Sequence, residues 1–116
     1  MGNMAIREFR VTLPPTEAMD LIKKSIIKGS VTGKIVDSYA REIGDYEVFV
    51  FILEKFYMRA SRASLTVTID NFEDVTKVHA VASGGSEGIL PIDWGAGKSF
   101  VRIVENTLRP YLIVEE

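Results

Sequence analysis

The first part of the chain alternates apolar and polar residues. Phe9, Val11 and Leu13 are apolar, and a polar residue precedes each of them. This period of two predicts a strand with one buried face. The strand has to end at Pro14-Pro15, because proline lacks a backbone N–H and restricts the residue before it.

The apolar spacing then changes to that of an amphipathic helix. One stripe is formed by Ala18, Leu21, Ile22 and Ile26. Thr16 can cap the first turn through its hydroxyl, and Gly29 suits the left-handed position after the last turn. We therefore expect a helix over residues 16–28.

Residues 33–83 return to the period of two and predict four strands. The expected strands are Ile35–Glu42, Tyr46–Met58, Ser64–Ile69 and Lys77–Ser83. Gly44-Asp45 and Asp70-Asn71, which lie between them, are typical of turns. Consecutive strands joined by short turns favour an antiparallel meander.

The strand at Tyr46–Met58 is apolar on both of its faces. One face carries Val48, Val50 and Ile52, and the other carries Phe49, Phe51 and Leu53. Helices can cover one face, but the second also needs a cover, because large exposed apolar patches are uncommon on monomers. Sheet curvature, another part of the chain or a second subunit can supply it, so a homodimer through the sheet is one hypothesis.

The last third of the chain predicts a loop and a closing helix. Residues 84–88 are glycine-rich, and an apolar connector follows over residues 89–94. A second helix is expected over residues 97–109, and Pro110 has to end or kink it. The order β-α-β-β-β-β-α predicts one α+β domain over residues 1–116. Its two layers are an antiparallel sheet and a long C-terminal helix packed on it.

Composition narrows the function classes. The chain has 116 residues, a net charge of −2, no cysteine and one histidine. Disulfides and thiolate metal sites are therefore excluded, and we expect no metal or cofactor. The net charge argues against nucleic-acid binding, which needs clustered positive charge.

The longest apolar run, Val48–Leu53, is too short to span a membrane, and no signal peptide is visible, so we expect a cytoplasmic protein. Whether residues 1–3 are native stays open.

Two possible chemical motifs have ordinary structural explanations. Residues 95–99 look like the end of a phosphate-binding loop, but Ile92 stands where that motif needs glycine. The favoured interpretation is an ordinary helix N-terminus, in which the glycines make the backbone more flexible. His79 falls on the same strand face as Lys77, and no sequence neighbour there offers the partner that a general base needs.

The arrangement of three segments resembles a known superfamily. The opening strand runs through Pro14–Ala18 into a helix, a hairpin joins Arg62–Asp70 to Thr76–Gly85, and the closing helix contains Phe100–Pro110. In this order the chain resembles the helix-grip superfamily of START and polyketide-cyclase-like domains. The residues around Gly84-Gly85-Ser86 and Asp93–Ala96 also resemble small bacterial proteins of uncharacterised function.

The superfamily resemblance implies a small apolar or amphipathic ligand between the sheet and the C-terminal helix. The predicted lining residues are Tyr39, Phe49, Phe51, Glu54, Trp94, Phe100 and Val104. A gate loop is predicted at Gly84, Gly85 and Gly88. The function predicted first is a non-catalytic ligand-binding module.

Two alternatives stay open. One is a structural or interaction protein that has a filled core and acts as a homo-oligomer. The other is a small enzyme of the cyclase or hydrolase type, which would need two of Glu54, Asp37 and His79 to converge on one enclosed site. A packed interior would favour the interaction protein over the ligand-binding module.

Overall fold

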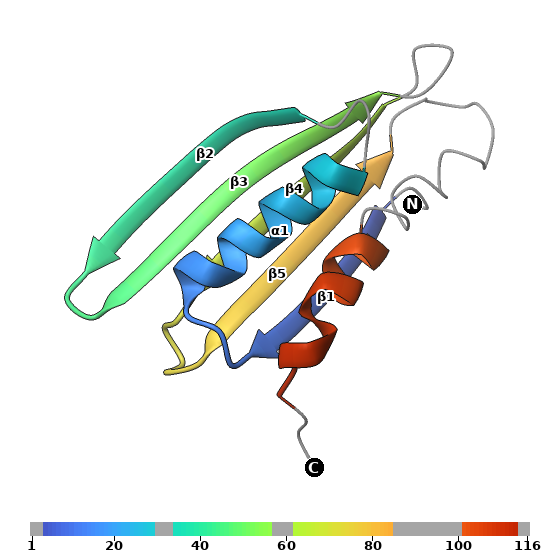
Figure 1. Cartoon of the computed structure of the whole chain (residues 1–116). Helices are drawn as coiled ribbons and strands as arrows, with labels where there is room; N and C mark the ends of the chain where they lie inside the picture. The colour runs from blue at the N-terminus through green and yellow to red at the C-terminus, as the bar shows by residue number, and fades with distance from the viewer. Residues whose placement is uncertain (1–3, 30–33, 57–61, 85–100, 114–116) are drawn as a thin grey trace.

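The computed structural model describes residues 4–29, 34–56, 62–84 and 101–113. Its strands are β1 (Met4–Val11), β2 (Lys34–Ile43), β3 (Tyr46–Phe56), β4 (Arg62–Asp70) and β5 (Thr76–Gly84). Its helices are α1 (Pro15–Gly29), a C-terminal helix at residues 101–108 and the 3-10 turn η2 (Arg109–Tyr111). Figure 1 shows these elements in the order predicted from the sequence.

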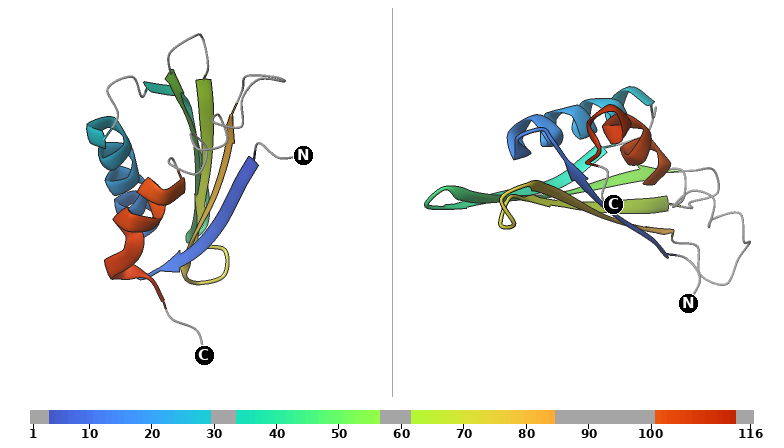
Figure 2. Two further views of the ribbon diagram at one scale, coloured as in Figure 1. Left: turned by 90° about the vertical axis from the view of Figure 1, so that its right-hand side faces the viewer. Right: turned by 90° about the horizontal axis from the view of Figure 1, so that it is seen from below.

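The five strands form one antiparallel sheet in the order β1-β5-β4-β3-β2. The predicted meander is confirmed, because β2, β3, β4 and β5 are neighbours in sequence order. The first strand closes the sheet by pairing with the last. Figure 2 shows α1 and the C-terminal helix on the same face of this sheet. The predicted two-layer α+β fold with an antiparallel sheet is confirmed.

Helix α1 begins earlier than the sequence predicts. Pro15 is its first residue, and the Ala18 backbone N–H donates to the carbonyl of Pro14 at 3.0 Å, closing the first turn. Proline suits this position, because the N–H that it lacks would have no partner within the helix. The prediction of Thr16 as the cap is therefore wrong, since Thr16 lies inside the first turn.

The C-terminal helix changes from an α-helix to a 3-10 helix at Pro110, where the sequence predicts an end or a kink. Regular helix ends at Leu108, and η2 continues it through Pro110 to Tyr111. A 3-10 turn is common at helix ends. Residues 97–100, the predicted start of this helix, lie outside the described residues.

The core lies between the sheet and the two helices. From the sheet it contains Val11, Phe51, Leu53, Ala63, Leu65, Val67, Ile69, Val78, Ala80 and Ala82. From the helices it contains Ala18, Ile22, Ile26, Val101, Val104 and Leu108. Each of these side chains is 4% exposed or less. In the C-terminal helix, the buried residues Val101, Val104 and Leu108 recur at helical spacing.

A β-bulge in β2 changes which residues share a face. The register with β3 shifts between Ile35, which pairs with the buried Leu53, and Asp37, which pairs with Ile52. Without the extra residue, Ile35 and Asp37 would point to the same side of the sheet. The bulge instead turns Asp37 to the face away from the helices. Ile35 and Tyr39, which strict alternation would place on one face, therefore lie on opposite faces of the sheet.

We predict that substitutions on the two sides of α1 have unequal effects. Ile22→Ala empties a fully buried position and should lower the free energy of unfolding by about 2–5 kcal/mol. Ile27→Ala is the matched control, because Ile27 is 49% exposed on the same helix and its loss should cost below ~1 kcal/mol. Urea unfolding of both variants measures the difference. Equal losses would contradict this packing.

Candidate functional site

The interior between the layers is packed where the sequence placed a ligand. Phe51 and Val104 are both fully buried in the core, and Phe49 packs against its margin. Phe51 and Val104 therefore pack against other side chains in the way that is usual for a protein interior. Trp94, Phe100, Gly85 and Gly88 lie outside the described residues.

Two other predicted lining residues lie on the opposite side of the sheet. Tyr39 pairs with Val50 and Glu54 pairs with Ser64, on the face that the helices leave uncovered. The structure therefore does not bring them together with Phe51. Gly84 also differs from its predicted place in a loop, because it ends β5 and pairs with Ala63.

The candidate catalytic residues lie on the open face of the sheet rather than around an enclosed site. Asp37, Glu54 and His79 share the uncovered face, but they belong to β2, β3 and β5. Because β3 and β4 separate β2 from β5, Asp37 lies roughly 14 Å from the His79 strand at ~4.8 Å per strand. Among the described residues, no group of three or more His, Asp or Glu is placed to hold a metal ion.

A pocket of about 690 Å³ lies at one end of the two layers. The β1–α1 connection, two hairpin turns and the C-terminal segment meet there. Its lining comprises Val11, Thr12, Leu13, Pro14, Pro15, Asp45, Tyr46, Glu47, Asn71, Asp74, Val75, Thr76 and Ile113. The β2–β3 and β4–β5 hairpins contribute its acidic residues and Asn71.

Asn71 holds these two turns together. Its Oδ1 accepts a hydrogen bond from the Glu47 backbone N–H at 2.8 Å, and its Nδ2 donates to the Asp45 carbonyl at 3.2 Å. The Tyr46 hydroxyl donates across the same gap to Asp74 Oδ1 at 3.4 Å. Asp74 has a backbone φ of +67°, a left-handed conformation in which aspartate and asparagine are among the better tolerated residues.

The pocket combines apolar surface with negative charge. Leu13, Val75 and Ile113 are apolar lining residues, while Asp45, Glu47 and Asp74 are acidic ones. The described lining contains no lysine, arginine or histidine. Opposite charges attract over a few ångströms also at a protein surface, although water weakens the attraction. The pocket therefore suits an apolar group that carries a positive charge.

The sequence contains only part of the signal for this pocket. Asp70-Asn71 and Gly44-Asp45 were recognised as turns, and alternate hairpin turns of an antiparallel meander lie at the same end of the sheet. Polar residues of the two turns could therefore have been expected to meet. Nothing in the sequence indicated that the β1–α1 connection and Ile113 complete the lining.

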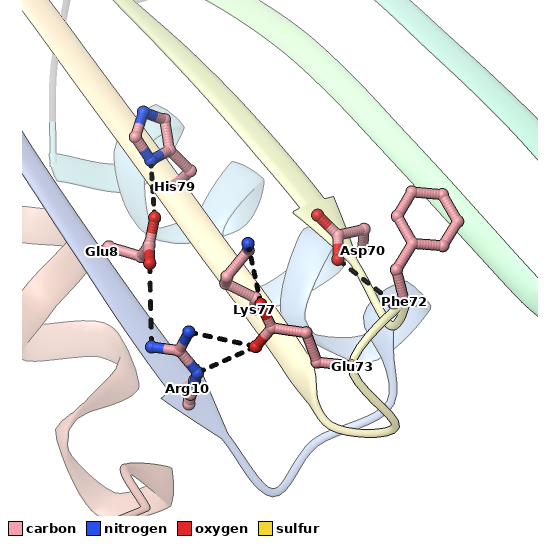
Figure 3. Close-up of polar contacts among 7 residues, drawn as sticks. All are labelled: Glu8, Arg10, Asp70, Phe72, Glu73, Lys77 and His79. Atoms are coloured by element: carbon pink, nitrogen blue, oxygen red, sulfur yellow. Dashed lines mark hydrogen bonds and ion pairs between the residues drawn. The ribbon is translucent and has the colours of Figure 1, made fainter.

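A second polar group lies on the uncovered face, around His79 (Figure 3). His79 Nδ1 is 3.0 Å from Glu8 Oε1, and Arg10 donates to Glu73 Oε1 from Nε at 3.1 Å and from Nη2 at 3.0 Å. Lys77 Nζ donates to Glu73 Oε2 at 3.3 Å. The partner of His79 is not apparent from neighbouring residues in the sequence, because Glu8 is far away along the chain and reaches His79 through the β1–β5 register.

Hydrogen bonding perturbs both carboxylates of this group. The hydrogen bond with His79 lowers the pKa of Glu8 below its ordinary value of 4.5. Hydrogen bonds from Arg10 and then Lys77 lower the pKa of Glu73 in the same way. His79 and Glu8 are each about 40% exposed and neither lines the pocket. The group thus connects β1 to β5 and to the β4–β5 turn, rather than enclosing a reaction site.

Comparisons with known proteins assign no activity. A model described as "Family of unknown function (DUF6054)" matches residues 4–112. A search of curated proteins gave no match. A crystal structure of Ara h 8.0201 is similar at 12% identity with a TM-score of 0.38, over 91% of this chain and 97% of that one. No described helix is long and apolar enough to cross a bilayer.

We predict that the Glu73 contacts stabilise the protein in a pH-dependent way. Glu73→Gln keeps the shape of the side chain but removes its charge, so it should lower the urea midpoint at neutral pH. A carboxylate with a lowered pKa stabilises the folded state above its unfolded pKa, and this stability is lost as the pH falls through the folded value. The difference from wild type should therefore shrink below pH 4.5.

The control for this experiment is Glu42→Gln, which removes an exposed carboxylate from β2. It should leave the neutral-pH midpoint nearly unchanged. A Glu73→Gln effect that stays constant down to about pH 3 would show that charge is not its cause.

Proposed function

The chain belongs to this family of unknown function, and we propose that it is a binding module for a small amphipathic molecule with a positive charge. The observation that carries the proposal is the pocket at the end of the layers, with its apolar side chains and its three carboxylates. This ligand is amphipathic, as expected from the sequence, but its site lies at the end of the two layers instead of in the interior between them.

The size and composition of the pocket support this function. Small-molecule sites are commonly about 300–1,000 Å³ and combine apolar walls with a few oriented polar groups. The pocket volume of about 690 Å³ falls in this range. Asn71 and Tyr46 fix its two turns relative to each other through hydrogen bonds. A pre-formed pocket binds with a smaller entropy cost than one that must be ordered by the ligand.

A second candidate function is an interaction protein that acts as a homo-oligomer. It is supported by the packed interior around Phe51 and by exposed large apolar residues on the sheet, such as Tyr39 and Ile43. This candidate does not compete with the pocket for residues, because neither side chain lines it.

We predict that a cationic probe binds the pocket in preference to neutral and anionic relatives. Phenethylamine, phenethyl alcohol and phenylacetate share an aromatic group and differ in charge. Each probe is titrated into ¹⁵N-labelled protein. Phenethylamine should shift the amide signals of Asp45, Asn71, Asp74 and Val75 more than the other two probes do. Equal shifts with phenylacetate, or no shift in these residues with any probe, would contradict the proposed function.

Asp74→Asn tests the contribution of charge within the pocket. Asparagine tolerates the left-handed conformation at this position and can still accept a hydrogen bond from Tyr46. Loss of one charge near the bound amine should weaken binding roughly five-fold, or ~1 kcal/mol. Asp20→Asn, on exposed α1 surface outside the lining, is the matched control and should leave the affinity unchanged.

A further inference from the structure

The two edges of the sheet differ in how far other segments cover them. At the β1 edge, the C-terminal segment pairs with the strand end: Thr12 N–H donates to the Tyr111 carbonyl at 2.9 Å, and Ile113 N–H donates to the Arg10 carbonyl at 2.8 Å. Strand β2 is the other edge, and every residue in it except Ile35 is exposed. An edge strand of this length is a template for pairing with another strand.

We propose that β2 pairs antiparallel with β2 of a second copy of this chain, about a two-fold axis at Tyr39. The axis is perpendicular to the sheet, so each residue faces its counterpart on the same side of the joined sheet. The result is a symmetric dimer with one continuous sheet and all helices on the same face. This interface lies outside the ligand pocket, because no β2 residue lines the pocket.

Charge complementarity selects this register. The regular part of β2 after the bulge spans residues 37–43 and contains three charged residues, Asp37, Arg41 and Glu42. In this antiparallel arrangement, each residue lies opposite a residue on the same face of the sheet. Because side chains alternate between the two faces along a strand, the numbers of two such residues are both odd or both even. Asp37 with Arg41 is the opposite-charge pair in this segment that meets the condition. Pairing about Tyr39 forms it twice, whereas pairing about Arg41 sets like charges opposite each other.

The side chains around the axis suit this contact. Arg41 Nε donates to the Tyr39 hydroxyl at 2.7 Å, and its guanidinium lies 5.3 Å from the centre of the Tyr39 ring. This contact uses Nε, so the terminal nitrogens of Arg41 supply the bond to the partner carboxylate. On the helix side of the strand, Ser38 comes opposite the small Ala40 of the second copy. No bulky pair obstructs the approach there.

Exposed apolar side chains add surface to the same edge. Tyr39 is 52% exposed and Ile43 is 72% exposed, although both are large apolar residues. Tyr39 meets its own copy at the axis, where an aromatic cross-strand pair contributes favourably. Burial of these groups gives the pairing an apolar contribution in addition to its backbone hydrogen bonds and ion pairs.

Charge-reversal variants test the proposal by sedimentation velocity. The wild-type protein should dimerise in a concentration-dependent way at micromolar to submillimolar concentration. Asp37→Arg sets arginine opposite arginine at both contacts, and Arg41→Asp sets aspartate opposite aspartate. Each single variant should raise the dimer dissociation constant roughly ten-fold or more.

Two rescue experiments separate a specific register from general surface charge. The double variant Asp37→Arg, Arg41→Asp restores both ion pairs in reversed order and should dimerise again. An equimolar mixture of the two single variants should form a heterodimer, because every contact then joins arginine to aspartate. Asp20→Arg on α1 makes the same charge change away from β2 and should leave the dimer intact.

Other results would overturn the proposal. A wild-type protein that stays monomeric would show that β2 does not pair with its own copy. Single variants that still dimerise as wild type would place the interface elsewhere, such as on the uncovered face. Single variants that lose the dimer without rescue in the mixture would reject the Tyr39 register. Circular dichroism of each variant establishes that it is folded.

Discussion

The burial of a single face of the sheet against two helices is the constraint on which the rest of this structure depends. The apolar stripes of α1 and the C-terminal helix both cover the face that contains Phe51, Leu65 and Val78. Burial of apolar surface is the main favourable contribution to folding, so this face sets the register of the strands that contribute buried residues to it. A slip of one residue in β4 would exchange Leu65 and Val67 for polar threonines.

Covering one face leaves the other to be stabilised by different means. On β5 and β1, charged side chains form ion pairs and hydrogen bonds on this face. Glu73 accepts hydrogen bonds from both Arg10 and Lys77. On β4 a row of serine and threonine side chains suits contact with water. Single exposed ion pairs contribute little to stability. Here several of them add side-chain contacts to the backbone pairing between β1 and β5. On the β2 edge, by contrast, large apolar residues stay exposed.

The fold could be predicted because its signals are local. Alternation in Leu65, Val67 and Ile69, helical spacing at Ile22 and Ile26, and short turns between strands each act over a few residues, and together they determine two layers. The candidate sites could not be predicted in the same way, because they depend on distant segments. The β2 bulge moved Tyr39 to the face opposite Phe51, and Glu8 reaches His79 only through strand pairing. Backbone register, rather than residue type, decided both outcomes.

The pocket and the unpaired edge follow from one topological fact. Strand β1 pairs with β5, the last strand of the meander, so β2 remains an edge although it follows β1 in the chain. In the same meander the β2–β3 and β4–β5 turns lie at one end, where Asn71 joins them and their acidic residues line the pocket. The edge residues Asp37, Tyr39 and Arg41 and the acidic pocket residues Asp45 and Asp74 lie outside the core. Both can change chemically while the packing between the sheet and the helices stays the same.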